Sequence, residues 1–345
     1  MSYKPYNILV TGGAGFIGSH FIRYYQTQYP DVFILNIDKL TYAGSLSNLK
    51  QLPYPEKYRF IQGDILDNKL IAGLLRDFKI DTIVHFAAET HVDRSIHNPD
   101  IFVQANILGT FNLLENSRSY WLEKLKLNDS SCRFHHISTD EVYGSLDKNQ
   151  PAFTELTPYR PTSPYSSSKA AADHLVRSYY HTYKLPISIT HCSNNYGPLQ
   201  HNEKFIPTII NCCLKQKPIP VYGDGSNIRD WIFVEDHCCG IAQVIHKGKV
   251  GETYNIGGNN ELSNLEVIYR ICELLNKAKP IDYCYTKLIH GVKDRAGHDW
   301  RYAINIKKIS KAFNWYPKES FSSGIFKTFL YYQLKEKNSC SLFNY

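Results

Sequence analysis

The sequence predicts an α/β fold in which a parallel, doubly wound sheet is followed by a smaller C-terminal α/β domain. Short apolar segments that suit buried strands alternate with longer segments whose apolar residues recur at helical spacing. A glycine-rich turn follows directly on the first of these strands. The length of 345 residues is sufficient for one large or two modest domains.

The expected strands of the first domain are short and apolar, and small or polar residues follow most of them. They cover residues 7–11, 32–37, 59–62, 81–88, 133–138 and 186–191. Apolar residues at helical spacing predict a helix over 101–121, and Pro164 is suited to the start of another helix. This alternation predicts a parallel sheet with helices on both faces.

After residue 198 the alternation becomes less regular. Strands are expected at 219–222, 228–234 and 253–256, and helices at 205–214, 235–246, 263–276 and 320–337. We predict a nucleotide-binding domain over residues 1–195 and a second, mainly substrate-binding domain over 196–337, from which some segments return to the first. Residues 338–345 are expected to form a mobile polar tail.

The turn after the first strand has the spacing of a dinucleotide-binding motif. Gly12, Gly15 and Gly18 allow a tight turn and a close approach to a phosphate, and the following helix directs its N-terminal amides at the anion. Asp38 ends the next strand, where a carboxylate accepts hydrogen bonds from a ribose and repels a 2′-phosphate. This Rossmann-type arrangement predicts NAD rather than NADP, although Lys39 beside Asp38 weakens the preference.

Two further strand ends have open interpretations. Asp64 could bind the adenine edge, but an aspartate at such a position is as often a turn or cap residue. Ala87 and Ala88 permit close approach of a cofactor, and ordinary packing explains them equally well.

A catalytic group is expected between residues 137 and 169. Thr139, Asp140 and Glu141 follow a strand, at the edge where an open α/β sheet binds its ligands. Tyr165 and Lys169 are four residues apart and therefore share a helix face, so that the ammonium would lower the pKa of the phenol and make it a base. A chance Tyr-x-x-x-Lys match among 26 tyrosines, and an acidic pair that only starts a helix, remain the alternatives.

A basic group in the second half could bind a diphosphate, although a solvated basic surface is equally compatible with it. Its members are Arg229, Lys293, Arg295, His298 and Arg301.

Composition and charge restrict the class of protein. The net charge of +7 comes from 39 basic and 32 acidic residues without a long basic block, which favours a diphosphate ligand over nucleic acid. The nine cysteines lack a Cys-x-x-Cys spacing and suit reduced, buried thiols, so neither a metal site nor a disulfide framework is expected. Without a signal-peptide pattern or an apolar run long enough to span a bilayer, we expect a soluble, cytoplasmic protein without a membrane partner.

The combination of these motifs resembles the extended short-chain dehydrogenase/reductase family. Within it, Thr-Asp-Glu-Val-Tyr-Gly at 139–144 is similar to the signature of nucleotide-sugar 4,6-dehydratases. Further segments resemble those enzymes in the same order, so that the resemblance extends from about residue 7 to about residue 333. These segments are 85–95, 192–198, 203–207, 221–231 and 297–302.

The resemblance implies roles for individual residues. Tyr165 and Lys169 would serve sugar oxidation, Thr139 would orient the C4 hydroxyl, and Asp140 and Glu141 would carry dehydration. The implied cofactor-binding residues are Gly12, Gly15, Phe16, Ile17, Gly18, Asp38, Lys39, Thr41, Asp64, Ile65, Ala87, Ala88, Tyr165, Lys169, Cys192 and Asn194. The implied substrate-binding residues are Glu89, Thr90, His91, Thr139, Asn195, Glu203, Lys204, Phe205, Pro207, Tyr222, Arg229, Asn264, Arg295 and His298.

The activity that the resemblance implies is the NAD-dependent dehydration of dTDP-glucose in deoxysugar biosynthesis, by a homodimer. UDP- or CDP-glucose as substrate, a nucleotide-sugar 4-epimerase and a catalytically inactive NAD-sensing protein are the alternatives. The chain also departs from the family pattern at Thr90, His191, Ala296 and Asn305, where Ser, Arg, Pro and Asp are usual.

Overall fold

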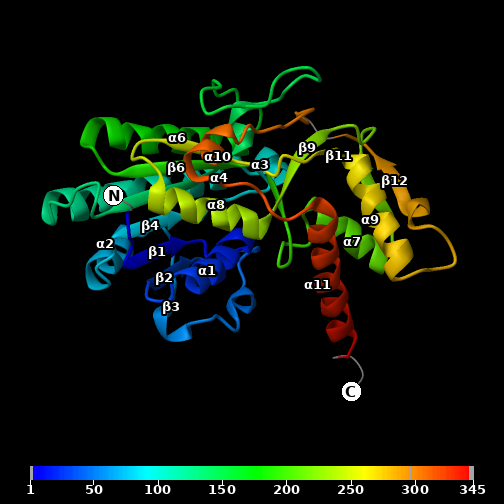
Figure 1. Cartoon of the computed structure of the whole chain (residues 1–345), viewed down its shortest axis with the longest axis horizontal. Coiled ribbons are helices and arrows are strands. Elements are labelled where there is room, and N and C mark those ends of the chain that lie inside the picture. Colours follow the sequence, from blue (N-terminus) through cyan, green and yellow to red (C-terminus); the bar gives the residue numbers. More distant parts are fainter. Residues whose placement is uncertain (1–2, 295–296, 342–345) are drawn as a thin grey trace.

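The computed structural model describes residues 3–294 and 297–341, and a seven-stranded parallel sheet organises it (Figure 1). The strand order is β10-β6-β5-β4-β1-β2-β3, and every neighbouring pair is parallel. The strands are β1 (Asn7–Thr11), β2 (Phe33–Asp38), β3 (Tyr58–Gln62), β4 (Thr82–His85), β5 (Arg133–Thr139), β6 (Ile187–Cys192) and β10 (Thr253–Ile256). The order reverses between β1 and β4, which places a ligand crevice at the carboxyl ends of these strands.

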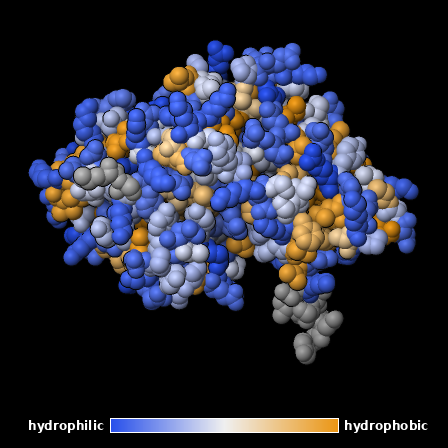
Figure 2. Space-filling model, viewed as in Figure 1, coloured by the Kyte–Doolittle hydropathy of each residue, from blue (hydrophilic) through white to orange (hydrophobic). Residues whose placement is uncertain are grey.

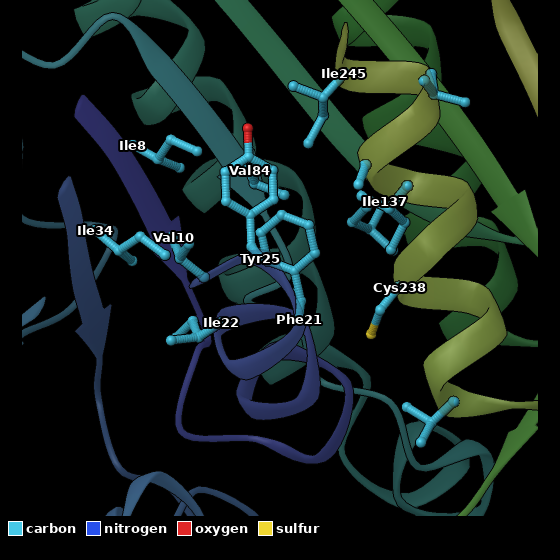
Figure 3. Close-up of a cluster of buried hydrophobic side chains, with 14 of the residues drawn as sticks. Ile8, Val10, Phe21, Ile22, Tyr25, Ile34, Val84, Ile137, Cys238 and Ile245 are labelled. Atoms are coloured by element: carbon cyan, nitrogen blue, oxygen red, sulfur yellow. The ribbon is translucent and has the colours of Figure 1, made fainter. Parts of the chain in front are cut away.

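Helices cover both faces of this sheet because its strands are apolar on both sides. Ile8 and Val10 of β1 pack into one core cluster, whereas Leu9 between them belongs to the cluster on the opposite face. Figure 3 shows the first cluster, where Phe21 and Tyr25 of α1 lie between the sheet and α8. The covering helices are α1 (Phe16–Gln28) and α8 (Val234–Lys247) on that face, and α2 (Asn68–Asp77), α5 (Gly109–Ser117) and α6 (Pro164–Tyr183) on the other.

A second, smaller α/β region has its own core, and it lies beside the carboxyl edge of the main sheet (Figure 1). Its sheets have the orders β11-β9-β7 and β12-β8. Its strands are β7 (Asn194–Tyr196), β8 (Ile219–Tyr222), β9 (Ile228–Phe233), β11 (Glu261–Ser263) and β12 (Ile289–Val292). Its helices are α7 (Phe205–Leu214), α9 (Asn264–Ala278) and α11 (Phe321–Ser341).

Short elements connect these parts. The α-helices among them are α3 (Val92–His97), α4 (Pro99–Phe102) and α10 (Lys307–Phe313). The 3-10 turns are η1 (Leu46–Leu49), η2 (Pro55–Lys57), η5 (Asp140–Tyr143) and η6 (Tyr285–Leu288), and the π-helices are η3 (Val103–Leu108) and η4 (Arg118–Lys124).

The predicted architecture is confirmed, and several local predictions need correction. The segment predicted as one helix over 101–121 is divided among α4, η3, α5 and η4. The strand predicted at 81–88 ends at His85, and the last helix reaches Ser341, beyond the predicted 337. β10 and α8, which come from after residue 195, complete the main sheet and its cover, while the division at 195 itself stays a prediction.

Hydrophilic residues dominate the face drawn in Figure 2, and apolar residues gather there beside α11. Within residues 3–294 and 297–341, no helix is both long and apolar enough to cross a membrane.

Candidate active site

Two adjoining cavities open at the carboxyl edge of the main sheet. The larger, of about 800 Å³, is lined by the glycine-rich turn and the ends of β2, β4, β5 and β6. The smaller, of about 430 Å³, lies against α7, β9 and α9. Thr90, Glu141 and Asn195 are among the residues that line both. A ligand with two chemically different halves could therefore extend through both cavities.

Gly12 and Gly18 of the glycine-rich turn have no space for a side chain. Gly12 has a φ of +71°, and a Cβ atom there would lie 2.7 Å from the Cα atom of Ala87. A Cβ atom on Gly18 would lie 2.4 Å from the carbonyl oxygen of Gly12. Gly15 is the N-cap of α1 and provides no side-chain acceptor, so the first amides of the helix are directed at the cavity.

Asp38 ends β2 at the wall of the larger cavity. Its Oδ2 accepts from the amide of Ala14 at 2.9 Å, and its Oδ1 accepts from the amide of Leu40 at 2.8 Å. Burial nevertheless raises the pKa of this carboxyl. Because a carboxylate oxygen has more than one lone pair, both oxygens can still accept from a ligand hydroxyl.

The cation of Lys39 is directed at Asp64 rather than at Asp38. The Nζ atom of Lys39 lies 2.7 Å from Oδ2 of Asp64, while Oδ1 of Asp64 accepts from the amide of Leu66. Asp64 thus forms the turn that the simpler interpretation expected, and it also lines the cavity. Because the charge of Lys39 is paired with Asp64, it is less available to attract the 2′-phosphate of NADP, and Asp38 can still favour NAD.

Asp140 is a buried carboxyl at the end of β5. Its side chain lies beside Thr139, and its Oδ2 has no hydrogen-bond partner. Burial first, and then the neighbouring charges of Glu141 and Asp230, raise the pKa of Asp140 well above its ordinary value. A carboxyl in this environment holds its proton to a higher pH than an exposed one, which suits an acid.

Tyr165 and Lys169 lie on α6, which begins at Pro164 as expected. Ser163 and Ser166 form a capping box that fixes the start of this helix and so the position of both side chains. Tyr165, Lys169, Thr139, Asp140 and Glu141 all line the larger cavity, so the structure brings the expected catalytic group together.

The expected effect of Lys169 on Tyr165 was wrong for this structure. Burial first, and then the charge of Glu141, raise the pKa of Tyr165 well above its ordinary value, and a hydrogen bond with Thr139 only partly opposes this. The reason is geometric: the ammonium of Lys169 donates to the carbonyl oxygen of Ile137 at 2.8 Å. Burial also lowers the pKa of Lys169 to about 8.

The remaining cofactor candidates lie together as the sequence suggested. Those that line the larger cavity besides the residues already discussed are Phe16, Ile17, Thr41, Ile65, Ala87, Ala88, Cys192 and Asn194.

Most substrate-binding candidates line the smaller cavity, the larger one or both. They are Glu89, Thr90, His91, Asn195, Glu203, Lys204, Phe205, Tyr222, Arg229, Asn264 and His298. Pro207 is different, because it is buried in α7 and lines neither cavity. Arg295 and Ala296 lie outside the described residues.

Only some residues of the predicted basic group line a cavity. Arg229 and His298 line the smaller cavity, whereas Arg301 forms an ion pair with Glu261 at 2.6 Å and Lys293 lines neither cavity. Asn305, one of the departures from the family pattern, accepts from the amide of Lys307 at the start of α10. It lines neither cavity.

Some residues that support the site carried no signal in the sequence. The side-chain amide of Asn106, on η3, accepts from the backbone amide of Glu89 at 2.8 Å and donates to its carbonyl oxygen at 3.0 Å, and it also donates to Ser168 on α6. His237 of α8 bonds to Oδ1 of Asn195 through its Nδ1 atom at 2.8 Å. Such contacts depend on the π-helical turn and on the packing of distant elements, neither of which has a periodic pattern.

Among the residues that the structure describes, no cluster of His, Cys, Asp or Glu has the arrangement of a metal site. The fold and the site together define a short-chain dehydrogenase/reductase with two adjacent carboxyl groups at its sheet edge. The family model for GDP-mannose 4,6 dehydratase matches residues 9–328. The chain belongs to this family, and within it to the dTDP-glucose 4,6-dehydratases.

The relatives cover nearly the whole chain. The dTDP-glucose 4,6-dehydratase of Neisseria gonorrhoeae is 51% identical over 94% of this chain and 95% of its own. The crystal structure of dTDP-glucose 4,6-dehydratase from Bacillus anthracis in complex with NAD has a TM-score of 0.84 and 46% identity, and covers 96% of this chain and 98% of its own. The corresponding enzyme DesIV from Streptomyces venezuelae, also with NAD, has a TM-score of 0.86 and 42% identity over the same shares.

Proposed function

We propose that this protein converts dTDP-glucose to dTDP-4-keto-6-deoxyglucose and water, with NAD as a cofactor that is regenerated in each cycle. The observation that carries the proposal is the pair Asp140 and Glu141 at the end of β5, in one cavity with Tyr165. Asp140 is buried and its pKa is raised, so an acid and a base stand next to each other. The name of the relatives supports the choice of sugar nucleotide.

The residues present fit NAD. Gly12 and Gly18 let the turn pack against the backbone of Ala87 and of Gly12, and Gly15 presents the start of α1 to the cavity without a side chain, which suits the close approach of a pyrophosphate. Asp38 offers carboxylate oxygens to a ribose, and relatives with solved structures contain NAD. Bound there, the nicotinamide supplies reversible hydride transfer, first from C4 of the sugar and later back to C6.

Oxidation at C4 requires a base for the hydroxyl proton. Tyr165 takes this proton while Thr139, which is within hydrogen-bond reach of Tyr165, orients the hydroxyl. Lys169 contributes a buried positive charge four residues along the same helix face. The resulting C4 ketone makes the neighbouring C5 proton acidic.

Elimination requires a second base and an acid. Glu141 removes the C5 proton, and Asp140 gives its proton to the departing C6 hydroxyl, which leaves as water. The electron pair of the C5–H bond forms the C5–C6 double bond. Return of the hydride to C6 and of a proton to C5 then completes the product. The partly exposed Glu141 and the buried Asp140 have the different environments that separate a base from an acid.

A nucleotide-sugar 4-epimerase is the nearest alternative, and it needs neither a C5 base nor a C6 acid. Incubation with dTDP-, UDP- and CDP-glucose, followed by mass spectrometry for loss of one water, separates these functions. We expect dTDP-glucose to be converted fastest and no NADH to accumulate. Stoichiometric NADH, or an epimer with unchanged mass, would overturn the proposal.

We also infer that the protein is a cytoplasmic homodimer. Val103, Leu108 and Phe111 on η3 and α5 have exposed fractions of 44, 42 and 45%, and a pair of helices from a second copy could cover them. Sedimentation of the wild-type protein and of a Phe111→Glu variant tests the assembly, which we expect to change from dimer to monomer.

The unpaired state of the cysteines among the described residues suits a reducing compartment.

A further inference from the structure

A buried polar network lies behind the catalytic edge, between α6 and strands β5 and β6. Asp173 of α6 is at its centre, and the side chains of Asp173, His136 and His191 have no exposed surface. Oδ2 of Asp173 lies 2.8 Å from Nε2 of His191 and accepts from Ser138 at 3.0 Å and from Tyr159 at 2.8 Å. The network therefore contacts the backbone segment that presents the catalytic carboxylates.

The same network reaches Lys169. The Nζ atom of Lys169 lies 3.5 Å from Nε2 of His136, and this nitrogen lies 3.3 Å from Oδ1 of Asp173. Tyr165, Lys169 and Asp173 are spaced by four residues along α6 and thus share the face that packs on the sheet. Nε2 of His136 therefore lies within 3.5 Å of both the ammonium and the carboxylate, which places the charge of Asp173 close to that of Lys169.

Lys169 needs a compensating negative charge because burial opposes its protonated form. The imidazoles of His85 on β4 and His136 on β5 face it, and burial lowers the pKa of both, so they are neutral near pH 7. Cys192 on β6 also faces it, and burial raises the pKa of this thiol to about 12.

The other groups near Lys169 do not supply the compensating negative charge either. Tyr165 on the same helix has a raised pKa and is neutral, and His191 on β6 is engaged with Asp173 and, through Nδ1, with the hydroxyl of Tyr143 at 2.8 Å. Asp173 favours the charged form of Lys169. Burial acts to raise the pKa of Asp173, but the contacts with His191 and His136 outweigh burial, and the pKa of this carboxyl lies well below its ordinary value.

We propose that Asp173 is a positioning residue that keeps Lys169 protonated in the dehydration reaction proposed above, on which this inference rests. It acts through its negative charge, without touching the substrate. Since burial disfavours the phenolate of Tyr165, a maintained positive charge in the same cavity is needed for the oxidation step.

Asp173→Asn tests this proposal, because the amide keeps the shape of the side chain and removes its charge. Trace acetylation with acetic anhydride between pH 6 and 10, followed by peptide mass spectrometry, reports the protonation midpoint of Lys169 without any need for activity. We expect a midpoint near the pKa of about 8 in the wild type. The variant should shift it down by about one pH unit or more.

Tyr159→Phe is the matched control, because it removes a hydrogen bond to the same oxygen of Asp173 and keeps the charge. If the network has only a structural role, both variants should shift the protonation midpoint of Lys169 by similar amounts. If Asp173 acts through its charge, only Asp173→Asn should shift it. At pH 8 the Asp173→Asn variant should also lose roughly five-fold in kcat, as the protonated fraction falls, with KM for the nucleotide sugar unchanged.

An unchanged Lys169 midpoint in Asp173→Asn, or an equal shift in Tyr159→Phe, would overturn the proposal. If Asp173→Asn does not fold, Asp173→Ser removes the same charge with a smaller side chain and should lower the midpoint as well. A wild-type protein without dehydratase activity would overturn the proposed function, whereas the acetylation comparison would still decide whether Asp173 controls the charge of Lys169.

Discussion

The hydroxyl of Thr139 lies 3.5 Å from Oδ1 of Asp140, and the same hydroxyl accepts from the amide of Glu141 at 3.3 Å. Thr139 thus ends β5, caps the 3-10 turn η5 through the backbone amide of Glu141, and lies beside the carboxyl of Asp140. Asp140 is 2% exposed, while Glu141 is only partly buried. Adjacent positions in sequence therefore have different environments, and this difference supports different proton-transfer roles.

Replacement of Asp140 by Asn should stabilise the protein at neutral pH while it reduces activity. Burial raises the pKa of Asp140 in the folded state, so the unfolded chain ionises first as the pH rises above about 4. The stability that the neutral carboxyl contributes is complete below that pH and is lost as the pH increases. We expect the free energy of unfolding in urea to be higher for the variant than for the wild type at pH 7.5, and this difference should shrink as the pH is lowered towards about 4.

Asp236→Asn serves as the control for this measurement. Oδ2 of Asp236 accepts from the amides of Lys318 and Glu319, so its loss should destabilise the protein without a comparable effect on the active site. If Asp140→Asn destabilised the protein at pH 7.5, the burial of an uncompensated carboxyl at position 140 would be the wrong explanation.

Tyr165→Phe should lower kcat by roughly 10²- to 10⁴-fold, the range for a positioned acid or base. The ring packs edge to face against Phe102, with centroids 6.3 Å apart, and this contact persists in the variant. KM for the nucleotide sugar should change little, and thermal unfolding should show an intact fold. Turnover close to that of the wild type would mean that another group takes the C4 proton.

Asp38→Ala should weaken NAD binding by roughly 10- to 100-fold, as expected for the loss of a charge-assisted hydrogen bond. The variant should also discriminate less against NADP, because the repulsion of a 2′-phosphate is removed. Calorimetric titration with both cofactors checks this, and Lys39→Ala is the control because its charge pairs with Asp64 instead. Equal affinity of the wild-type protein for NAD and NADP would contradict the assignment.

The sequence was sufficient for the sheet and for the group at its edge because both depend on local patterns. Strand alternation placed β1 at Asn7–Thr11, and the glycine spacing and the acidic strand end pointed to residues that line the larger cavity. The prediction that Tyr165 and Lys169 share a helix face was also correct, because Ser163 and Pro164 fix where α6 begins. Each of these features is contained within a few neighbouring residues.

Other features depend on tertiary packing and could not be predicted in this way. Asp173 is an ordinary helix residue in sequence, and only the approach of β5 and β6 surrounds it with His136 and His191. The direction of the Lys169 ammonium likewise follows from the carbonyl of Ile137, a backbone atom without a sequence signature. Burial then reversed the expected change in the pKa of Tyr165.

The last prediction separates the two adjacent carboxylates. Glu141→Gln should abolish exchange of the C5 proton with deuterated solvent, because an amide cannot accept that proton. Asp140→Asn should retain oxidation at C4 and slow the loss of the C6 hydroxyl, because an amide is too weak an acid to protonate it. Each substitution should cost roughly 10²- to 10⁴-fold in overall turnover, but at a different step.

Substrate deuterated at C4 provides the reference for both variants. In the wild type the label should appear at C6 of the product, since the hydride stays within one active site. Glu141→Gln and Asp140→Asn are matched isosteric changes at neighbouring positions, so a general disturbance of η5 would affect both alike. Identical blocked steps in the two variants, or label lost to solvent in the wild type, would show that Asp140 and Glu141 do not act as a separate acid and base.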